Sequence, residues 1–473
     1  MHSPEPVRVT RTSPRVHPSL CRSALAVAAV AVLAAVGPEA LAQSSSPPSS
    51  PPDDSALGTV EVDGSAGGIA PRPKLGLVPT PPAGEADRTA RDVVRNDLDL
   101  SGAYEVLADD KAPDPAATRD SLIDLVAWRG KGAEAVVRLT LDPSAPVATP
   151  TLVAEAYLTA GATPLAAGAD PSAAPRPLYR GVFPVPAGTS PRAASHRVTD
   201  ALLGALTGRP GAFASRLAFA QRAGRWQTAQ SIDADGFGQA LESPTDSTVM
   251  SPAFGPGGRL FYLISRDYAP FHAATGVAGT ILPFNLPGSA LGLAFSPDGT
   301  RTAVTVMRDG KSLIMVGEPN DAGKLTAGPA SPLAHHPAFG PLGKMAYVGG
   351  APVQRVHVDG APVSPAGFMA SAPSFCDTAQ GLLLVFTVEV QGGAELVATD
   401  TRGGGLRRLT QRQGENRYPA CSPDGRMVAF FSTTETGAGP GLYVMPVLRP
   451  WMARKVAGGA GQSVVWERLP PTK

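Results

Sequence analysis

The sequence has few cysteines, few aromatic residues and almost no net charge. Of its 473 residues only 3 are cysteines and 6% are aromatic, and the formal net charge is +1. This balance gives no support to a role in binding nucleic acid or an acidic membrane surface. Glycine (52) and proline (50) are abundant instead, which predicts many turns and few long helices.

The sequence also lacks an apolar run long enough to span a bilayer, which takes about 20 residues. Its most apolar run, 24–36, has 13 residues; four arginines precede it and Ala40-Leu41-Ala42 follows it. A basic region, a short apolar run and a small-residue cleavage site describe a secretory signal peptide over residues 1–42. We therefore expect a mature chain that is soluble outside the cytoplasm, with a retained short anchor as the alternative.

Cleavage after residue 42 would leave two cysteines, Cys376 and Cys421. Export permits a disulfide, but two cysteines cannot form a disulfide framework for a chain of this length. Both occupy small or apolar positions in the repeats described below. We expect two buried thiols, and a bridge between them is the alternative.

Composition and periodicity divide the rest of the chain. Residues 43–73 are rich in Pro, Ser and Gly and are expected to form a flexible segment. Residues 74–212 mix helical and strand patterns, which predicts a compact α/β domain. The expected strands of this domain are 75–78, 104–107, 133–141 and 151–159, and its expected helices are 85–98, 122–128 and 193–206.

A repeat replaces the helical pattern beyond residue 212. Each copy has a short apolar strand, a tight turn such as Ser422-Pro423-Asp424-Gly425, and a second strand. The copies are aligned on one mostly aromatic position, at separations of 41, 44, 36 and 46 residues: Phe254, Phe295, Phe339, Phe375 and Cys421. This period is typical of the four-stranded blades of a β-propeller.

The phase of the repeat indicates how such a ring would close. A weak further copy, Ser463–Trp466, provides a single strand near the end of the sequence. Three strand-like runs without such a strand precede the first copy, at 216–220, 226–232 and 239–242. We expect the late strand to pair with them, because a propeller needs closure to hide its sheet edges. The predicted fold is an α/β N-terminal domain followed by an all-β six-bladed β-propeller over 213–473.

Three phrases carry a resemblance to a known family: residues 96–107 (NDLDLSGAYEVL), residues 206–219 (LTGRPGAFASRLAF) and Asp233-Ala-Asp-Gly236. Together with the repeats they resemble the TolB family, the periplasmic component of the Tol-Pal system, over nearly the whole mature chain. The resemblance implies a monomeric, non-enzymatic periplasmic scaffold that binds the lipoprotein Pal and the protein TolA. It also implies attachment to the outer membrane through Pal and support of membrane integrity and constriction during cell division.

The resemblance also indicates binding residues. The loops of the family that face Pal come immediately before the first strand of certain blades, and the corresponding positions here are Ser289, Gly292, His335 and His336. The segment that binds TolA lies ahead of the α/β domain, and its counterpart contains Val60, Glu61, Val62 and Asp63.

The sequence contains little that suggests catalysis. A serine hydrolase of the kind that follows some propellers needs a Gly-x-Ser-x-Gly elbow, which is absent. Asp233 and Asp235 precede Gly236 and could ligate calcium, but this composition is also that of an ordinary turn, which we expect. Glu389 and Glu395 flank a Gly-Gly hairpin and are expected to face solvent.

His335 and His336 could be a pair of metal ligands. Adjacent residues on a strand point in opposite directions, however, and no third ligand is near in sequence. Histidines in a loop at a binding mouth are the preferred interpretation, and an ordinary surface turn is the alternative. We predict no catalytic, cofactor or metal site. The alternatives are a periplasmic propeller enzyme, such as a metal-dependent lyase or lactonase, and an unrelated binding propeller.

Overall fold

The computed structural model describes residues 54–58, 70–81, 84–114, 118, 120–142, 144–146, 149–164, 174–319, 324–411, 414–434 and 438–468. All of these residues belong to one compact unit, residues 49–473. The predicted signal peptide and the predicted TolA-binding residues Val60, Glu61, Val62 and Asp63 lie outside the described residues. None of the helices formed by the described residues is long and apolar enough to cross a membrane.

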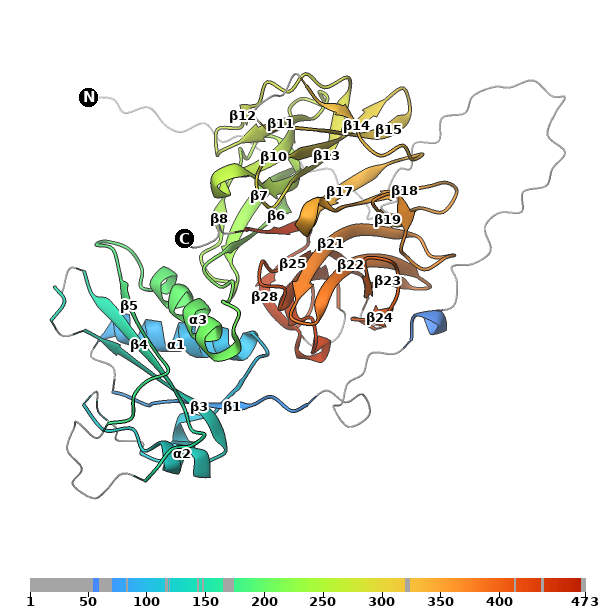
Figure 1. Ribbon diagram of the computed structural model, residues 1–473. Helices are drawn as coiled ribbons and strands as arrows, with labels where there is room; N and C mark the ends of the chain where they lie inside the picture. The colour runs from blue at the N-terminus through green and yellow to red at the C-terminus, as the bar shows by residue number, and fades with distance from the viewer. Residues whose placement is uncertain are drawn as a thin grey trace, which may run out of the picture. The chain divides into compact units, whose positions relative to one another are not determined.

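The first part of the described chain is a five-stranded sheet with helices on both faces (Figure 1). Its strand order is β2-β1-β3-β4-β5, and its elements are β1 Lys74–Leu77, α1 Glu85–Leu100, β2 Glu105–Val106, α2 Leu125–Gly130, β3 Ala133–Leu141, β4 Thr151–Leu158, β5 Tyr179–Pro184 and α3 Arg192–Thr207. Strand β3 alternates between two cores: Val137 packs with α1 and α3, and Val136 packs with Trp128 of α2. The periodicity of apolar residues therefore assigns each helix to a face.

Most predicted elements of this part are confirmed, with two differences. Helix α2 begins at Leu125 and not at residue 122, because the Asp124 carboxylate accepts hydrogen bonds from the backbone N–H groups of Val126 and Ala127. This N-cap fixes the helix start. Strand β5 was not predicted; its residues are only half-buried or exposed, so it lacks the apolar signal of an interior strand.

The second part consists almost entirely of strands, with an eight-stranded sheet and four four-stranded sheets. The eight-stranded sheet contains β6 Arg216–Ala223, β7 Trp226–Asp233, β8 Ala240–Leu241, β9 Thr248–Phe254, β10 Leu260–Ser265, β11 His272–Thr275, β12 Thr280–Ile281 and β29 Gly461–Trp466. The other sheets are, in order, β13 Ser289–Phe295, β14 Thr302–Arg308, β15 Lys311–Gly317 and β16 Thr326–Ala327; β17 His335–Phe339, β18 Met345–Gly349, β19 Arg355–Val358 and β20 Ala361–Pro362; β21 Ala370–Thr378, β22 Gly381–Val390, β23 Gly393–Asp400 and β24 Arg407–Arg408; β25 Asn416–Cys421, β26 Met427–Ser432, β27 Gly441–Pro446 and β28 Arg454–Gly458. Short 3-10 turns occur at Asp54–Leu57, Asp109–Lys111, Pro256–Gly258, Pro341–Gly343 and Pro450–Met452.

The late strand β29 pairs as the repeat predicts. It runs antiparallel to β6, with Gly461 opposite Gln221 and Trp466 opposite Leu217. The Trp466 indole N–H also donates to the Ser215 hydroxyl at 2.8 Å. Residues far apart in sequence thus complete one sheet.

The strands that carry the repeat phrase, β9, β13, β17, β21, β25 and β29, are called the inner strands below. Five of them contain a non-glycine residue with positive φ, three residues before the aligned position: Ser251, His336, Ala372, Tyr418 and Ser463. The pairing register shifts at the same places. Each shift is a β-bulge, which interrupts the alternation of side chains along the strand.

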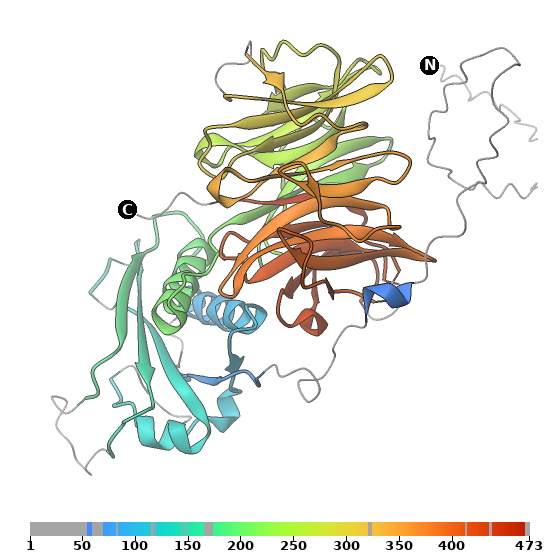
Figure 2. The ribbon, with the colours of Figure 1, turned by 45° about the vertical axis from the view of Figure 1, so that its right-hand side comes forward.

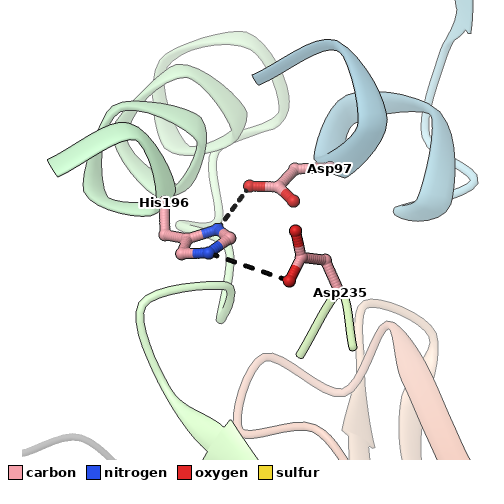
Figure 3. A group of neighbouring side chains, drawn as sticks. All are labelled: Asp97, His196 and Asp235. Atoms are coloured by element: carbon pink, nitrogen blue, oxygen red, sulfur yellow. Dashed lines mark hydrogen bonds and ion pairs between the residues drawn. The ribbon is translucent and has the colours of Figure 1, made fainter. Parts of the chain in front are cut away.

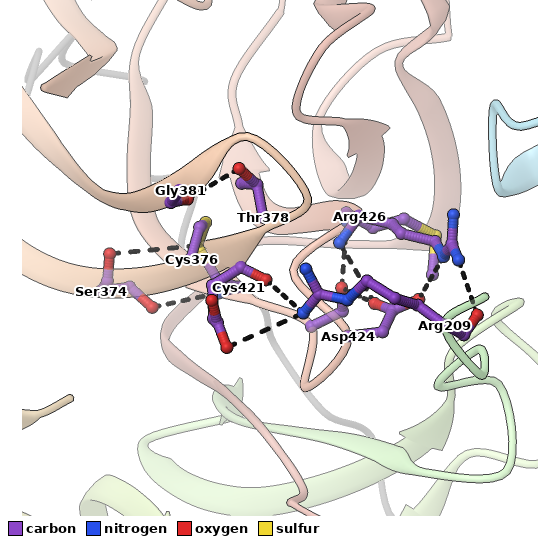
Figure 4. The surroundings of a disulfide bond; sticks show 11 residues. Arg209, Ser374, Cys376, Thr378, Gly381, Cys421, Asp424 and Arg426 are labelled. Carbon is purple, nitrogen blue, oxygen red and sulfur yellow. Dashed lines mark hydrogen bonds and ion pairs between the residues drawn. A yellow bond between two sulfur atoms is a disulfide. The ribbon is translucent and has the colours of Figure 1, made fainter. Parts of the chain in front are cut away.

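Cys376 and Cys421 form a disulfide, so the expectation of two free thiols is wrong (Figure 4). The bond joins the neighbouring inner strands β21 and β25, whose cysteine Cα atoms are 5.3 Å apart. Cys421 occupies the repeat position that is aromatic in the other full copies. A covalent bond therefore replaces the aromatic side chain between these two sheets. The Cys421 N–H also donates to the Ser374 hydroxyl at 3.0 Å.

Glu395 does not face solvent as expected, because it is only 1% exposed. Its carboxylate pairs with the buried Arg408 guanidinium at 3.1 Å and accepts a hydrogen bond from the Thr410 hydroxyl at 2.6 Å. The turn of the hairpin ends before Glu395, so Glu395 lies within strand β23 and its side chain is buried. Glu389 is partly exposed and pairs with Arg417.

Candidate binding surface

Each sheet of the second part has two ends, and the inner strands define them. The starting edge is the end at which the inner strands begin, and the turn edge is the end at which the repeat turns follow. The turn edge surrounds a cavity of about 390 Å³ lined by residues from all of the inner strands. All of the inner strands therefore border one cavity, and Figure 2 shows the sheets of the second part stacked one beside the next.

The predicted Pal-facing residues lie on two neighbouring inner strands. Ser289 begins β13, Gly292 lies further along it, and His335 and His336 begin β17. A side chain at Gly292 would meet Pro337 Cδ at 3.6 Å, so the two strands are in contact beside the histidines. These residues belong to strands and not to loops, because the inner strands extend past the repeat phrase toward the starting edge. The structure thus brings the four residues to one region.

The two histidines contact each other, which the sequence did not predict. Their Nδ1 atoms are 2.6 Å apart, because His336 lies at a bulge with φ 48° and the usual alternation is lost. His336 is exposed at the surface. Partial desolvation by neighbouring protein atoms, with repulsion from His335, lowers the pKa of His336. Desolvation also lowers the pKa of His335, so both rings are neutral at pH 7.

Exposed apolar side chains lie at the starting edge around these residues. Leu333 and Met369 precede the inner strands β17 and β21 and are 38% and 48% exposed. Tyr268, fully exposed, lies in the loop between β10 and β11. The backbone of this loop reaches the predicted residues, because the Phe271 N–H donates to the Ser289 hydroxyl at 3.1 Å. Exposed apolar groups with a polar surround are typical of protein-binding surfaces.

The cavity at the turn edge is lined by few ionisable side chains. Of the described residues that line it, only Asp298 and Arg468 carry a charge. The Asp298 carboxylate accepts hydrogen bonds from Ser296 and Thr300 of its own turn. The described lining therefore offers no pair of groups suited to acid–base catalysis.

A second cluster, which the sequence analysis missed, joins the two parts of the chain. His196 of α3 is 2% exposed and lies between Asp97 of α1 and the turn after β7 (Figure 3). Its Nδ1 atom is 2.7 Å from Asp97 Oδ2, and its Nε2 atom is 3.7 Å from Asp233 and 4.0 Å from Asp235. Arg192, one turn earlier on α3, pairs with Asp235 and lies over the Phe237 ring.

The electrostatics of this cluster favour a charged histidine. Burial alone would lower the pKa of His196, but Asp233 and Asp97, with the charge of Asp235, outweigh this effect and raise it to about 10. Burial raises the pKa of Asp97 to about 6. At pH 7 the imidazolium and the carboxylate of this pair are therefore both charged.

Asp97, His196 and Asp235 also bring donor atoms within 4.8 Å of one another. Two cations already face these carboxylates, the His196 imidazolium and the Arg192 guanidinium. A metal ion would have to displace a bound proton and sit beside the guanidinium. We therefore interpret the cluster as an ion-pair network. The predicted turn at Asp233–Gly236 is confirmed, since the Gly236 N–H donates to the Asp233 carbonyl at 2.9 Å.

Further contacts join the two parts on the side of α1 and α3. The Arg209 guanidinium donates to the Asp377 carbonyl at 2.7 Å, and Arg426 donates to the Thr207 hydroxyl at 2.6 Å, close to the disulfide (Figure 4). On α1, Asp99 pairs with Arg454 of β28. One apolar core also continues from the five-stranded sheet into β6, β26, β27 and β29.

Comparisons with known proteins support the TolB resemblance. Residues 60–146 match the family model of the TolB amino-terminal domain. The Tol-Pal system protein TolB of Anaeromyxobacter dehalogenans is 34% identical over 148 residues, which is 30% of this chain and 34% of that protein. The protein of the same name from Aromatoleum aromaticum is 29% identical over 184 residues, 39% of either chain. The matches thus span between a third and two fifths of these relatives.

The fold comparison covers more of the chain. The crystal structure of TolB from Acinetobacter baumannii superposes with a TM-score of 0.65 at 19% identity, over 84% of this chain and 97% of that one. The resemblance to the TolB family is confirmed by the amino-terminal domain and by this shared fold.

Proposed function

We propose, with the TolB family as the premise, that this chain is a scaffold of a Tol-Pal system. It works in the periplasm, binds Pal through the second part and TolA through the segment containing Val60, Glu61, Val62 and Asp63, and catalyses no reaction. Its role is to support outer-membrane integrity and constriction during cell division. The observation that carries the proposal is the apolar starting edge around Ser289 and the two histidines.

We interpret the second part as a six-bladed propeller. In support, each inner strand contacts the next around a cycle: β9, β13, β17, β21, β25, β29 and back to β9. In this interpretation the eight-stranded sheet is two blades, which are joined by a single parallel pair, Gln227 with Thr248. The pairing of β29 with β6 then completes the first blade and closes the ring.

The starting edge suits a protein partner. Tyr268, Leu333 and Met369 offer exposed apolar surface, and the neutral histidine pair adds a polar group that can donate or accept hydrogen bonds. Aromatic and methionine side chains are enriched at protein interfaces. The Arg417–Glu389 ion pair, joined to the next inner strand β25, supplies charge at the rim of this surface.

The disulfide supports a location outside the cytoplasm. Cys376 and Cys421 are bonded within a protein whose sequence begins with a signal-peptide pattern. Disulfides form and persist in oxidising compartments such as the periplasm. This agrees with the proposed place of the scaffold.

A binding assay tests the proposal. Purified mature protein is titrated with the soluble domain of Pal from the same organism, and calorimetry should show one-to-one binding. Tyr268→Ser and Met369→Ser should each weaken binding about tenfold, as expected of apolar interface anchors. Leu342→Ser is the matched control, because Leu342 is 97% exposed but lies at the turn edge. No binding by the unmodified protein, or an equal loss in the control, would overturn the proposal.

The TolA assignment needs a separate test. Alanine substitution of Val60 and Val62 should abolish binding of the TolA C-terminal domain and leave Pal binding unchanged. The same substitutions at Ser46 and Ser49 of the Pro/Ser-rich segment provide the control. Retained TolA binding by the first variant would contradict this assignment alone.

A further inference from the structure

His196 is a buried histidine whose two ring nitrogens face carboxylates of different parts of the chain. Nδ1 lies 2.7 Å from Asp97 of α1, and Nε2 faces Asp233 and Asp235 in the turn after β7. The Nε2 distances of 3.7 and 4.0 Å are those of ion pairs and are too long for hydrogen bonds. A single ring therefore stands between a helix of the α/β part and a turn of the strand-rich part (Figure 3).

Four charged groups among the described residues face this ring. Helix α1 contributes Asp97, the turn contributes Asp233 and Asp235, and α3 contributes Arg192. Asp200, further along α3, interacts with Asp97, but it accepts its own hydrogen bonds from the backbone N–H groups of Phe213 and Ala214. Arg192 neutralises one carboxylate near the ring, so two remain for His196.

A neutral ring would leave the Asp97 carboxylate without a cationic partner, since Arg192 pairs with Asp235. Asp97 and Asp235 repel each other, which contributes to the raised pKa of Asp97. Asp97 is fully buried and Asp235 is nearly so. Buried charges without a partner cost several kcal/mol each. A protonated His196 supplies the cation for Asp97 and also faces Asp233 and Asp235 of the strand-rich part.

We propose that His196 stays protonated throughout the physiological pH range and acts as a bridging cation that fixes the α/β part against the turn after β7. The histidine is a positioning residue: it determines how the amino-terminal domain is held and contacts no partner protein. This inference does not depend on the identity of the partners.

The pH dependence follows from the direction of the shift. A histidine whose pKa is raised on folding contributes stability that is fully present below the ordinary value near 6.5. That contribution is lost as the pH rises through about 10. The bridging cation should thus be intact over the whole physiological range and be lost only in alkali.

Two measurements test the proposal. The first is a titration of the imidazole signals in 13C-histidine-labelled mature protein, with His196 assigned from the spectrum of His196→Gln. We expect this ring to stay protonated to pH 9 or above, because its neighbouring carboxylates raise its pKa to about 10. A His196 pKa at or below 6.5 in the wild-type protein overturns the proposal.

The second measurement reports how the two parts are held. Spin labels replace the exposed residues Arg129 and Lys311, one in each part, and the spread of distances between them is compared at pH 7.5. His196→Gln and Asp235→Asn should each broaden the distribution about twofold or more, as expected when a buried contact opens locally. His272→Gln is the matched control and should change nothing. Unchanged distributions in both cluster variants refute the bridging role.

Discussion

Removal of the Cys376–Cys421 bond should strongly destabilise the strand-rich part. The bond closes a loop of 45 residues, and both side chains are buried. The chain-entropy relation for a loop of this length gives about 4 kcal/mol. At about 2–4 °C per kcal/mol for a region of this size, the melting temperature should fall by about 8–16 °C. The loss of stability should affect the contact between β21 and β25 most, because the bond joins these two inner strands.

The assay compares four thermal unfolding curves, recorded by circular dichroism of the β-sheet signal. Wild-type protein and the double variant Cys376→Ala/Cys421→Ala are each measured with and without a thiol reductant. Reduction should lower the melting temperature of the wild type to that of the variant. The variant controls for other effects of the reductant and should not respond to it.

One result would refute this reasoning. If fully reduced wild-type protein, confirmed by thiol counting, melts within about 2 °C of the oxidised form, the bond contributes less than about 1 kcal/mol. The hydrogen bond from the Cys421 N–H to Ser374 and the apolar packing around it would then suffice to hold the two sheets together.

Three further predictions concern stability. Trp466→Ala should cost about 3–5 kcal/mol in urea unfolding, since the indole is 6% exposed; a cost below about 1 kcal/mol would show that β29 is dispensable. Glu395→Ala should cost about 3–5 kcal/mol because it removes the carboxylate from a buried ion pair. Glu389→Ala on the partly exposed pair should cost only about 0–1 kcal/mol, and equal costs would contradict the burial argument. Burial raises the pKa of Asp200 to about 7, so stability should fall as the pH rises from about 4 to about 7, and Asp200→Asn should flatten this part of the curve; an unchanged slope would argue against it.

The repeat made much of the strand-rich part predictable. Its phrase fixes a strand, a turn and a second strand at each copy, and turn chemistry is local. The pairing of β29 with β6 followed because the last copy has only one strand and the runs before the first copy lack that strand. Strand β5 escaped prediction because its burial depends on packing under α3, which sequence periodicity does not report.

The candidate sites were predictable only in part. Equivalent positions of a repeat come to the same edge, so Gly292 and His336, each three residues before the aligned position, lie on neighbouring inner strands. The contact between His335 and His336 depends on a bulge, and a bulge changes side-chain direction without a composition signal. The cluster around His196 joins residues 99 positions apart, and a single histidine on a helix carries no signal of its partners.

The pairing of Gly461 with Gln221 has a consequence for how the molecule assembles. Contacts that join such distant segments form slowly, because the entropy cost of closing a long loop comes before these contacts can stabilise the structure. Until residues 461–466 pair with β6, the edge of β6 away from β7 presents unpaired N–H and C=O groups to any neighbouring chain. Substitutions that delay this final step should therefore appear first as aggregation during biogenesis, with the affinity of the surviving molecules unchanged.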